Sequence, residues 1–238
     1  MMYVPTGAPT RSMQSWWLGL RRLILSKDKI TIDALGRQFQ CSDIRSKMLA
    51  FTEVTQWVHQ DYRRGAMLAP TFKQNGISRT ELNNAYFLDE RELRLRARHP
   101  LASIGGHTNS HVALANLDTS SARAELADNC HYLENLLQLP VQHLAYPYGT
   151  VRACGPREEH LANDVGFQSA VTTRQGQLYD RNVNRFALPR IGVYSRSVFR
   201  AEMTGIVDGM QALRQRLRTD HATGPHDQLT ELDARNSR

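Results

Sequence analysis

The stretch LASIGGHTNSH, residues 101–111, constrains this chain more than any other part of its sequence. The apolar run at 101–104 predicts a buried strand, and Gly105-Gly106 lets the backbone leave that strand in a conformation that other residues resist. His107 and His111 follow, and a single helical turn between them would direct both imidazoles the same way. Two convergent neutral imidazoles are a common protein contribution to a zinc site. The alternative is a strand-end histidine and a surface histidine, each satisfied by backbone or water.

The order of parts around the two histidines disfavours one class of zinc enzyme and favours another. Thr108 stands where the H-E-x-x-H motif of a zinc protease carries its glutamate base. Here an H-T-x-x-H motif precedes a predicted helix and then LAYPYG at 144–149. This order resembles the polysaccharide deacetylases, the NodB-homology group of carbohydrate esterases (family 4) that includes chitooligosaccharide deacetylase. GFQSAVTTRQG at 166–176 and ALPRIGV at 187–193 also resemble this family, with a thinner likeness in YVPTGAPTRSMQSWWL near the N-terminus.

The resemblance implies both a fold and a site. The fold is α/β, an incomplete NodB-like (β/α) barrel with a helical insertion and a C-terminal helix. His107 and His111 would be two ligands of a divalent metal, with zinc expected, and Tyr146, Pro147 and Tyr148 would line the substrate groove. The backbone N–H of Tyr148 would donate to the oxyanion that forms when water attacks an acetamide carbonyl.

Several parts of the family's machinery are missing from these 238 residues. The T-F-D-D-G motif, which supplies the general base and the third metal ligand in the family, does not occur, so we expect an N-terminally truncated domain. Ala145 stands where many members carry an arginine that orients the catalytic aspartate, and no histidine near Arg190 matches the family's late general acid. Asp118 and Asp164 are the nearest candidates for a third ligand, although their spacing argues for neither.

Three functions from different classes follow from these observations. The first is a metal-dependent hydrolase that removes N-acetyl or O-acetyl groups from a polysaccharide or chitooligosaccharide, or an inactive form of it because the aspartate motif is absent. The second is a non-catalytic deacetylase remnant that binds sugar or metal. The third is a basic partner-binding protein with incidental histidines.

Charge and cysteine usage bound the partners and the compartment. The net charge is +7 and the pI is about 9.6, but the arginines are spread along the chain without interleaved aromatic residues, so nucleic acid is not expected as a partner. No apolar run long enough to span a membrane occurs, and no signal peptide is seen. The cysteines Cys41, Cys130 and Cys154 form no C-x-x-C motif, so a reducing compartment, the cytoplasm, is expected.

Periodicity and capping residues predict the elements and the domain limits. Residues 1–218 are expected to form the deacetylase-like domain with an inserted cap at about 27–88, and 219–238 a disordered tail. The pair Trp16-Trp17 is expected to pack in the core rather than to grip a sugar. Helices are predicted at 13–26, 42–59 with Ser42 as cap, 89–98, 119–138 with Ser120 or Ser121 as cap, 156–165 and 195–218. Residues 66–86 are expected to form a short helix, a loop at Asn75-Gly76 and a second helix that starts at Ser78. A hairpin is predicted at 30–41, and strands at 2–4, 142–146, 166–173 and 186–193.

Overall fold

The computed structural model describes residues 1–178 and 183–191. The chain divides into two compact units, and the first, residues 1–174 and 182–188, holds every helix and strand named below. The predicted C-terminal helix at 195–218 and the predicted tail at 219–238 lie outside the described residues.

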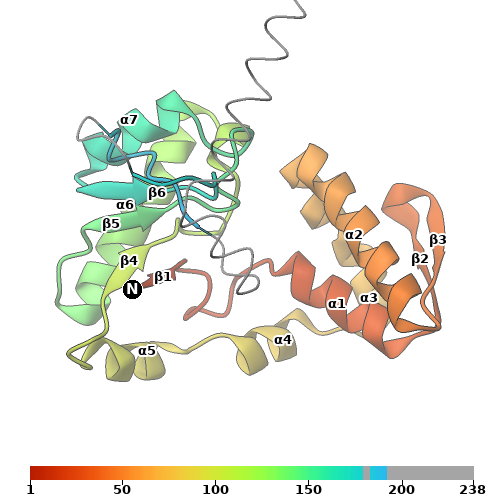
Figure 1. Cartoon of the computed structure of the whole chain (residues 1–238). Helices are drawn as coiled ribbons and strands as arrows, with labels where there is room; N and C mark the ends of the chain where they lie inside the picture. The colour runs from red at the N-terminus through yellow and green to blue at the C-terminus, as the bar shows by residue number, and fades with distance from the viewer. Residues whose placement is uncertain (179–182, 192–238) are drawn as a thin grey trace, which may run out of the picture. The chain divides into compact units, whose positions relative to one another are not determined.

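A four-stranded parallel sheet forms one part of this unit (Figure 1). Its strands lie in the order β1 (Met2–Val4), β4 (Ile104–Gly106), β5 (His143–Ala145) and β6 (Ser169–Val171). Each neighbouring pair is parallel, and α-helices connect β4 to β5 and β5 to β6. The predicted α/β class with parallel strands and crossover helices is therefore confirmed.

Two helices pack on the sheet, α6 (Thr119–Leu137) and α7 (Pro156–Val165) (Figure 1). The side chain of Asp118 caps α6 by accepting a hydrogen bond from the backbone N–H of Ser121, so the predicted serine cap was wrong by two or three positions. Apolar side chains of both helices and of the strands form one core, with Leu126, Leu133, Leu144, Leu161, Phe167 and Ala170 among its members. Burial of this apolar surface is what holds the helices to the sheet.

The strand before the histidines begins later than predicted. Leu101 is 88% exposed and lies in a turn, whereas the ladder with β1 starts only at Ile104. A Cβ atom on Gly105 would lie 2.7 Å from the carbonyl oxygen of His143 and 2.6 Å from the ring of Tyr3. Glycine is therefore required here for close packing between strands, a reason that differs from the backbone freedom predicted.

A helical region separates β1 from β4 in the sequence, and the predicted helical insertion is confirmed. Its second apolar core is built around Leu20, Leu23, Ile32, Val54 and Leu68. The predicted hairpin is present, with Gly36 in the left-handed region at φ +64°. The elements are α1 (Trp16–Ser26), β2 (Lys29–Ile32), β3 (Arg37–Gln40), α2 (Ile44–Gln60), α3 (Ala69–Gln74), α4 (Arg79–Tyr86) and α5 (Glu90–Ala97). The limits of an inserted cap at 27–88 stay a prediction.

Two smaller expectations in this region and at the end of the sheet need correction. Asp43, and not Ser42, caps α2, in a reciprocal arrangement with Ser46. The segment predicted as a last strand makes only an isolated parallel bridge between Leu188 and Val171, and its last two residues lie outside the described range. Within the part of the chain that the structure describes, no helix is both long and apolar enough to cross a membrane.

Candidate functional site

The imidazoles of His107 and His111 converge, with ring centroids 4.8 Å apart and ring planes at 75°. The chain between them does not form the predicted helical turn. Thr108 and His111 instead lie in the left-handed region, at φ 64° and 59°. The buried Thr108 hydroxyl accepts a hydrogen bond from the N–H of His111 at 3.0 Å and stabilises this turn. The two rings therefore meet through two unusual backbone conformations that sequence spacing does not reveal.

Two polar residues of α6 hold this loop in place. The Oδ1 atom of Asn129 accepts from the backbone N–H of His107 at 2.8 Å, while its Nδ2 donates to the carbonyl of Val4 at 3.0 Å. The carboxylate of Glu125 accepts from both the N–H and the hydroxyl of Ser110, at 2.8 and 2.6 Å. Neither residue was singled out from sequence. Asn129 carried a usable signal, because it lies three positions after Leu126 and four before Leu133 on the buried stripe of the helix.

Hydrogen bonding fixes the orientation of the His107 ring. Its Nδ1 lies 2.6 Å from the carbonyl oxygen of Ala145. Because a carbonyl can only accept, Nδ1 must carry a proton, and in the neutral form of the ring Nε2 then carries the lone pair. A metal-binding histidine is commonly oriented by such a bond from its other ring nitrogen.

Burial keeps the imidazole of His111 neutral, as a metal ligand requires. Its Nδ1 is buried and has no hydrogen-bond partner among the described residues. Burial, and secondarily the charge of His107, lowers the pKa of His111 to about 3. A neutral imidazole is the form that binds a metal ion.

The described residues bring no third ligand to this pair. Among them, no group of three or more His, Cys, Asp or Glu side chains is placed to hold a metal ion. Asp118 is used as the cap of α6 and accepts from the hydroxyls of Ser120 and Ser121, and Asp164 forms an ion pair with Arg123 at 2.8 Å. Neither predicted candidate therefore completes the site. The residues present fit two ligands of a divalent ion.

Tyr148 connects the histidines to a group of aromatic side chains. Its ring lies 5.3 Å from that of His111 and stacks on Tyr62 at 4.1 Å between centroids. The Tyr148 hydroxyl accepts a hydrogen bond from the indole Nε1–H of Trp16 at 3.0 Å. The imidazole of His59 lies 6.0 Å from the Tyr148 ring. Tyr62 and His59 come from the helical region, and no local signal in the sequence placed them here.

The backbone at Tyr148 is held in a strained conformation. Its φ is 63°, in the left-handed region, which a bulky residue rarely adopts. Its carbonyl accepts from the hydroxyl of Thr173 at 2.6 Å. Among the described residues, no acceptor engages the Tyr148 N–H. Strained residues of this kind are enriched at functional sites, and the role of this N–H as an oxyanion donor stays a prediction.

The two residues before Tyr148 are buried. Tyr146 is 1% exposed, and its hydroxyl donates to the carbonyl of Phe186 at 3.0 Å, while burial raises the pKa of Tyr146. Pro147 is buried as well. Their predicted contact with substrate stays a prediction. Trp16 is 8% exposed and belongs to the core of the helical region, as expected, although its indole N–H reaches the site.

Cavities lie on two sides of His111. One, of about 360 Å³, includes Trp16, Tyr62, Arg63, Ser110, His111, Asn116 and Tyr148 among its lining residues. The other, of about 320 Å³, is lined in part by Trp17, Tyr86, Phe87, His107 and His111. Aromatic walls with a few polar groups are typical of small-molecule sites.

Comparison with known proteins shows a similarity over less than half of the chain. The sequence model of the polysaccharide deacetylase family matches residues 64–168, and this confirms the resemblance. A search of the curated proteins found no match.

Solved structures with a similar fold include the deacetylase PplD of Streptococcus pyogenes in complex with acetate, at 23% identity over 47% of this chain and 47% of that one, with a TM-score of 0.41. A polysaccharide deacetylase from Bacillus cereus matches at 21% identity over 44% of this chain and 32% of that one, with a TM-score of 0.38. IcaB from Ammonifex degensii matches at 18% identity over 49% of this chain and 52% of that one, with a TM-score of 0.38. The chain thus spans about half, or less, of each of these structures.

Proposed function

We propose that this chain, whose residues 64–168 match the polysaccharide deacetylase family, is a hydrolase that removes acetyl groups from an N-acetylated or O-acetylated polysaccharide or oligosaccharide. One observation carries the proposal beyond the family match. Two imidazoles, one oriented by the Ala145 carbonyl and one with a buried nitrogen that has no partner among the described residues, meet beside Tyr148.

The proposal assigns His107 and His111 as two ligands of a divalent cation such as zinc. When bound, the cation supplies Lewis acidity toward the carbonyl of the acetyl group. The third ligand, the general base and the general acid come from outside the set that the described residues bring together. Asn129 and Glu125 accept hydrogen bonds from the backbone N–H groups of His107 and Ser110 and hold the loop between the ligands, so that little reorganisation is needed when the cation binds.

The chain's own residues then have defined tasks. The N–H of Tyr148 is proposed to donate to the oxyanion, and the left-handed backbone at this residue is what would present it. Tyr62, Tyr148 and Trp16 offer ring faces and edges to a sugar in the cavity of about 360 Å³. Their mutual packing keeps these rings in one arrangement before the substrate arrives.

Acetate release from N-acetylglucosamine oligomers, with and without added zinc or cobalt, tests this function. We expect metal-dependent release that His107→Ala abolishes, whereas His131→Ala, which removes an exposed imidazole of α6, leaves it unchanged. Zinc affinity measured by titration calorimetry should fall in the His107 variant alone. Release that persists in that variant, or that ignores a chelator, would contradict the assignment.

A second function, sugar binding without hydrolysis, is favoured by one specific observation. The described residues supply only two of the ligands that a catalytic zinc site needs. In that case N-acetylglucosamine oligomers would bind to folded protein, no acetate would appear with any metal, and Tyr62→Ala would weaken binding.

A further inference from the structure

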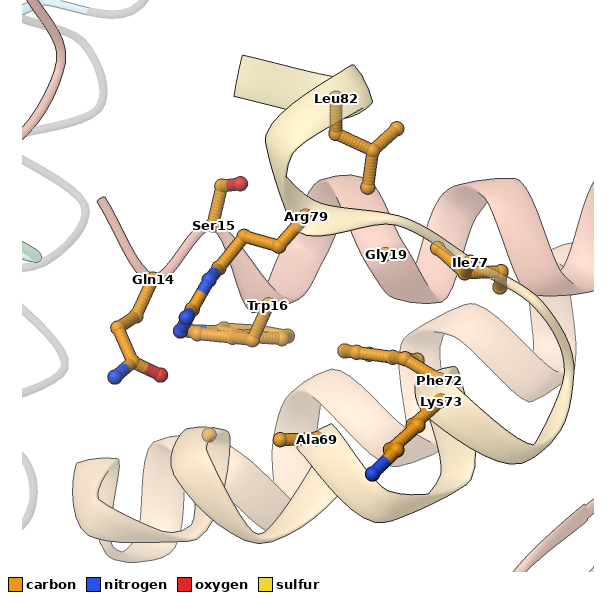
Figure 2. A pocket seen from close by; sticks show the side chains of 11 residues that line it. Gln14, Ser15, Trp16, Gly19, Ala69, Phe72, Lys73, Ile77, Arg79 and Leu82 are labelled. Atoms are coloured by element: carbon orange, nitrogen blue, oxygen red, sulfur yellow. The ribbon is translucent and has the colours of Figure 1, made fainter. Parts of the chain in front are cut away.

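A separate cavity of about 220 Å³ adjoins the candidate site at Trp16 (Figure 2). It shares Gln14, Trp16 and Gly65 with the cavity beside His111, so the Trp16 indole lines both spaces. Its lining residues come from α1, α3 and α4 and from the segments directly before these helices: Gln14, Ser15, Trp16, Gly19, Gly65, Ala69, Phe72, Lys73, Ile77, Arg79 and Leu82. Neither histidine of the proposed metal site belongs to this lining.

Two cations face this cavity without a negative partner. Lys73 and Arg79 both line it, and none of its lining residues is acidic. Within the described ranges, no ion pair or side-chain hydrogen bond engages either cation. Figure 2 shows Arg79 and Lys73 on either side of the Trp16 and Phe72 rings. The cavity therefore combines apolar ring walls with two uncompensated positive charges.

The walls of this cavity are built for close packing. A Cβ atom on Gly65 would lie 2.7 Å from Cδ1 of Trp16, and one on Gly19 would lie 2.6 Å from Cε2 of Phe72. Each ring thus rests directly on a glycine, and any larger residue would displace it. This gives both rings a fixed position at the cavity.

A buried polar contact joins α4, the helix that begins at Arg79, to the segment before α1. The side chain of Asn83 is fully buried and donates to the carbonyls of Arg11 and Met13, at 3.0 and 3.1 Å. The Ser15 hydroxyl donates to Oδ1 of Asn83 at 3.1 Å. These bonds tie α4, whose first residue is Arg79, to the start of α1, whose first residue is Trp16.

We propose that this cavity is a subsite for an anionic group, a carboxylate or a phosphate, carried by a sugar residue next to the one at His107 and His111. The substrate would then be an acidic acetylated polysaccharide, and this part of the inference rests on the proposed function. A guanidinium and an ammonium that flank aromatic rings recognise such a group through charge-assisted hydrogen bonds. The volume lies below the roughly 300–1,000 Å³ of drug-sized sites, which suits a single ring.

Binding of three probes to the full chain tests the subsite: trigalacturonate, inorganic phosphate and neutral tri-N-acetylglucosamine, each followed by titration calorimetry. We expect at least one of the two anions to bind, and the double variant Lys73→Gln/Arg79→Gln to weaken it by about tenfold. Binding of trigalacturonate alone identifies a uronate as the source of the charge, and binding of phosphate identifies a phosphorylated sugar. Affinity for the neutral trisaccharide should change by less than about twofold.

The matched control is Lys29→Gln/Arg45→Gln, which removes two exposed positive charges outside this cavity. An equal loss of anion binding in the control would mean that anions are attracted to the basic surface as a whole. That result would overturn the subsite. Failure of both anions to bind would also overturn it. Circular dichroism compares the folding of both double variants with that of the natural chain. Because all four substituted side chains are exposed, we expect no loss of secondary structure.

The two proposals can fail separately. Acetate release from neutral oligomers without any anion binding would leave the deacetylase function and remove the subsite. Anion binding that depends on Lys73 and Arg79, without acetate release from any substrate, would leave the subsite and remove the hydrolase.

Discussion

The indole Nε1–H of Trp16 donates a hydrogen bond to the hydroxyl of Tyr148, 3.0 Å away, and joins the first turn of α1 to the loop after β5. The two residues are 132 positions apart in the chain. Tyr148 is also in ring contact with His111, and Trp16 lines the cavities on both of its sides. This bond therefore couples the helical region to the proposed metal and substrate sites.

A double-mutant cycle should detect this coupling. We expect Trp16→Phe and Tyr148→Phe each to lower the free energy of unfolding. The loss in the double variant should be smaller than the sum of the two single losses by about 0.5–1.5 kcal/mol, because neither polar group is then left without its partner. Urea unfolding measures the four free energies. The pair Trp57→Phe and Tyr148→Phe is the control and should be additive. A coupling of zero for the first pair would show that the bond contributes nothing to stability.

Asn129 should be the most sensitive polar residue of α6. Asn129→Leu keeps the volume but leaves the His107 N–H and the Val4 carbonyl without their partner, which should cost about 2–4 kcal/mol of unfolding free energy. Asn135→Ala, at an exposed position of the same helix, should change it by less than about 0.5 kcal/mol. The midpoint temperature of thermal unfolding and the affinity for zinc should both be lower in the Asn129 variant. Unchanged zinc affinity would show that this residue serves the fold and not the ligand loop.

Close packing of β4 on its neighbours predicts a strong effect at Gly105. A Cβ atom there meets the backbone oxygen of His143 and the ring of Tyr3, so Gly105→Ala must displace a strand and should cost about 3 kcal/mol. Gly36→Ala meets no atom within 4 Å and should cost only about 1 kcal/mol, because of its positive φ. Urea unfolding of both variants compares them directly. Similar losses at the two positions would contradict this account of Gly105.

His111 should make the metal-free protein sensitive to acid. Its folded pKa is about 3, below the ordinary value of 6.5, so the unfolded chain binds more protons between these values. Stability is then complete above pH 6.5 and is lost as pH falls from 6.5 toward 3, by up to about 1.4 kcal/mol per pH unit.

Urea unfolding at pH 7, 6, 5 and 4, with a chelator present, measures this slope. His111→Gln should flatten it, whereas His131→Gln, at an exposed position, should leave it as in the natural chain. An unchanged slope in the His111 variant would mean that other groups cause the acid sensitivity.

Local signals in the sequence determined most of the elements. The helix at 156–165 begins and ends as predicted, because Pro156 favours a first turn and Gly166 adopts the left-handed conformation that ends a helix. The hairpin at 30–41 follows from alternation around Gly36, and α5 begins at its predicted cap, Asp89. The H-T-x-x-H motif and its position before LAYPYG were sufficient to indicate the deacetylase family. Such motifs can be read directly from the sequence because their residues lie close together in the chain.

Tertiary structure decided the surroundings of the site. The left-handed backbone at Thr108 and His111 depends on Thr108 Oγ1 and on the partners that α6 supplies, so helical spacing gave the wrong turn. Asn129 is buried because its hydrogen-bond partners lie in β1 and in the loop after β4, both far from it in the sequence. A search for periodic apolar residues does not detect such a polar residue. Trp16, Tyr62 and Arg79 reach their cavities through packing between segments far apart in the chain, and only the folded structure brings such segments together.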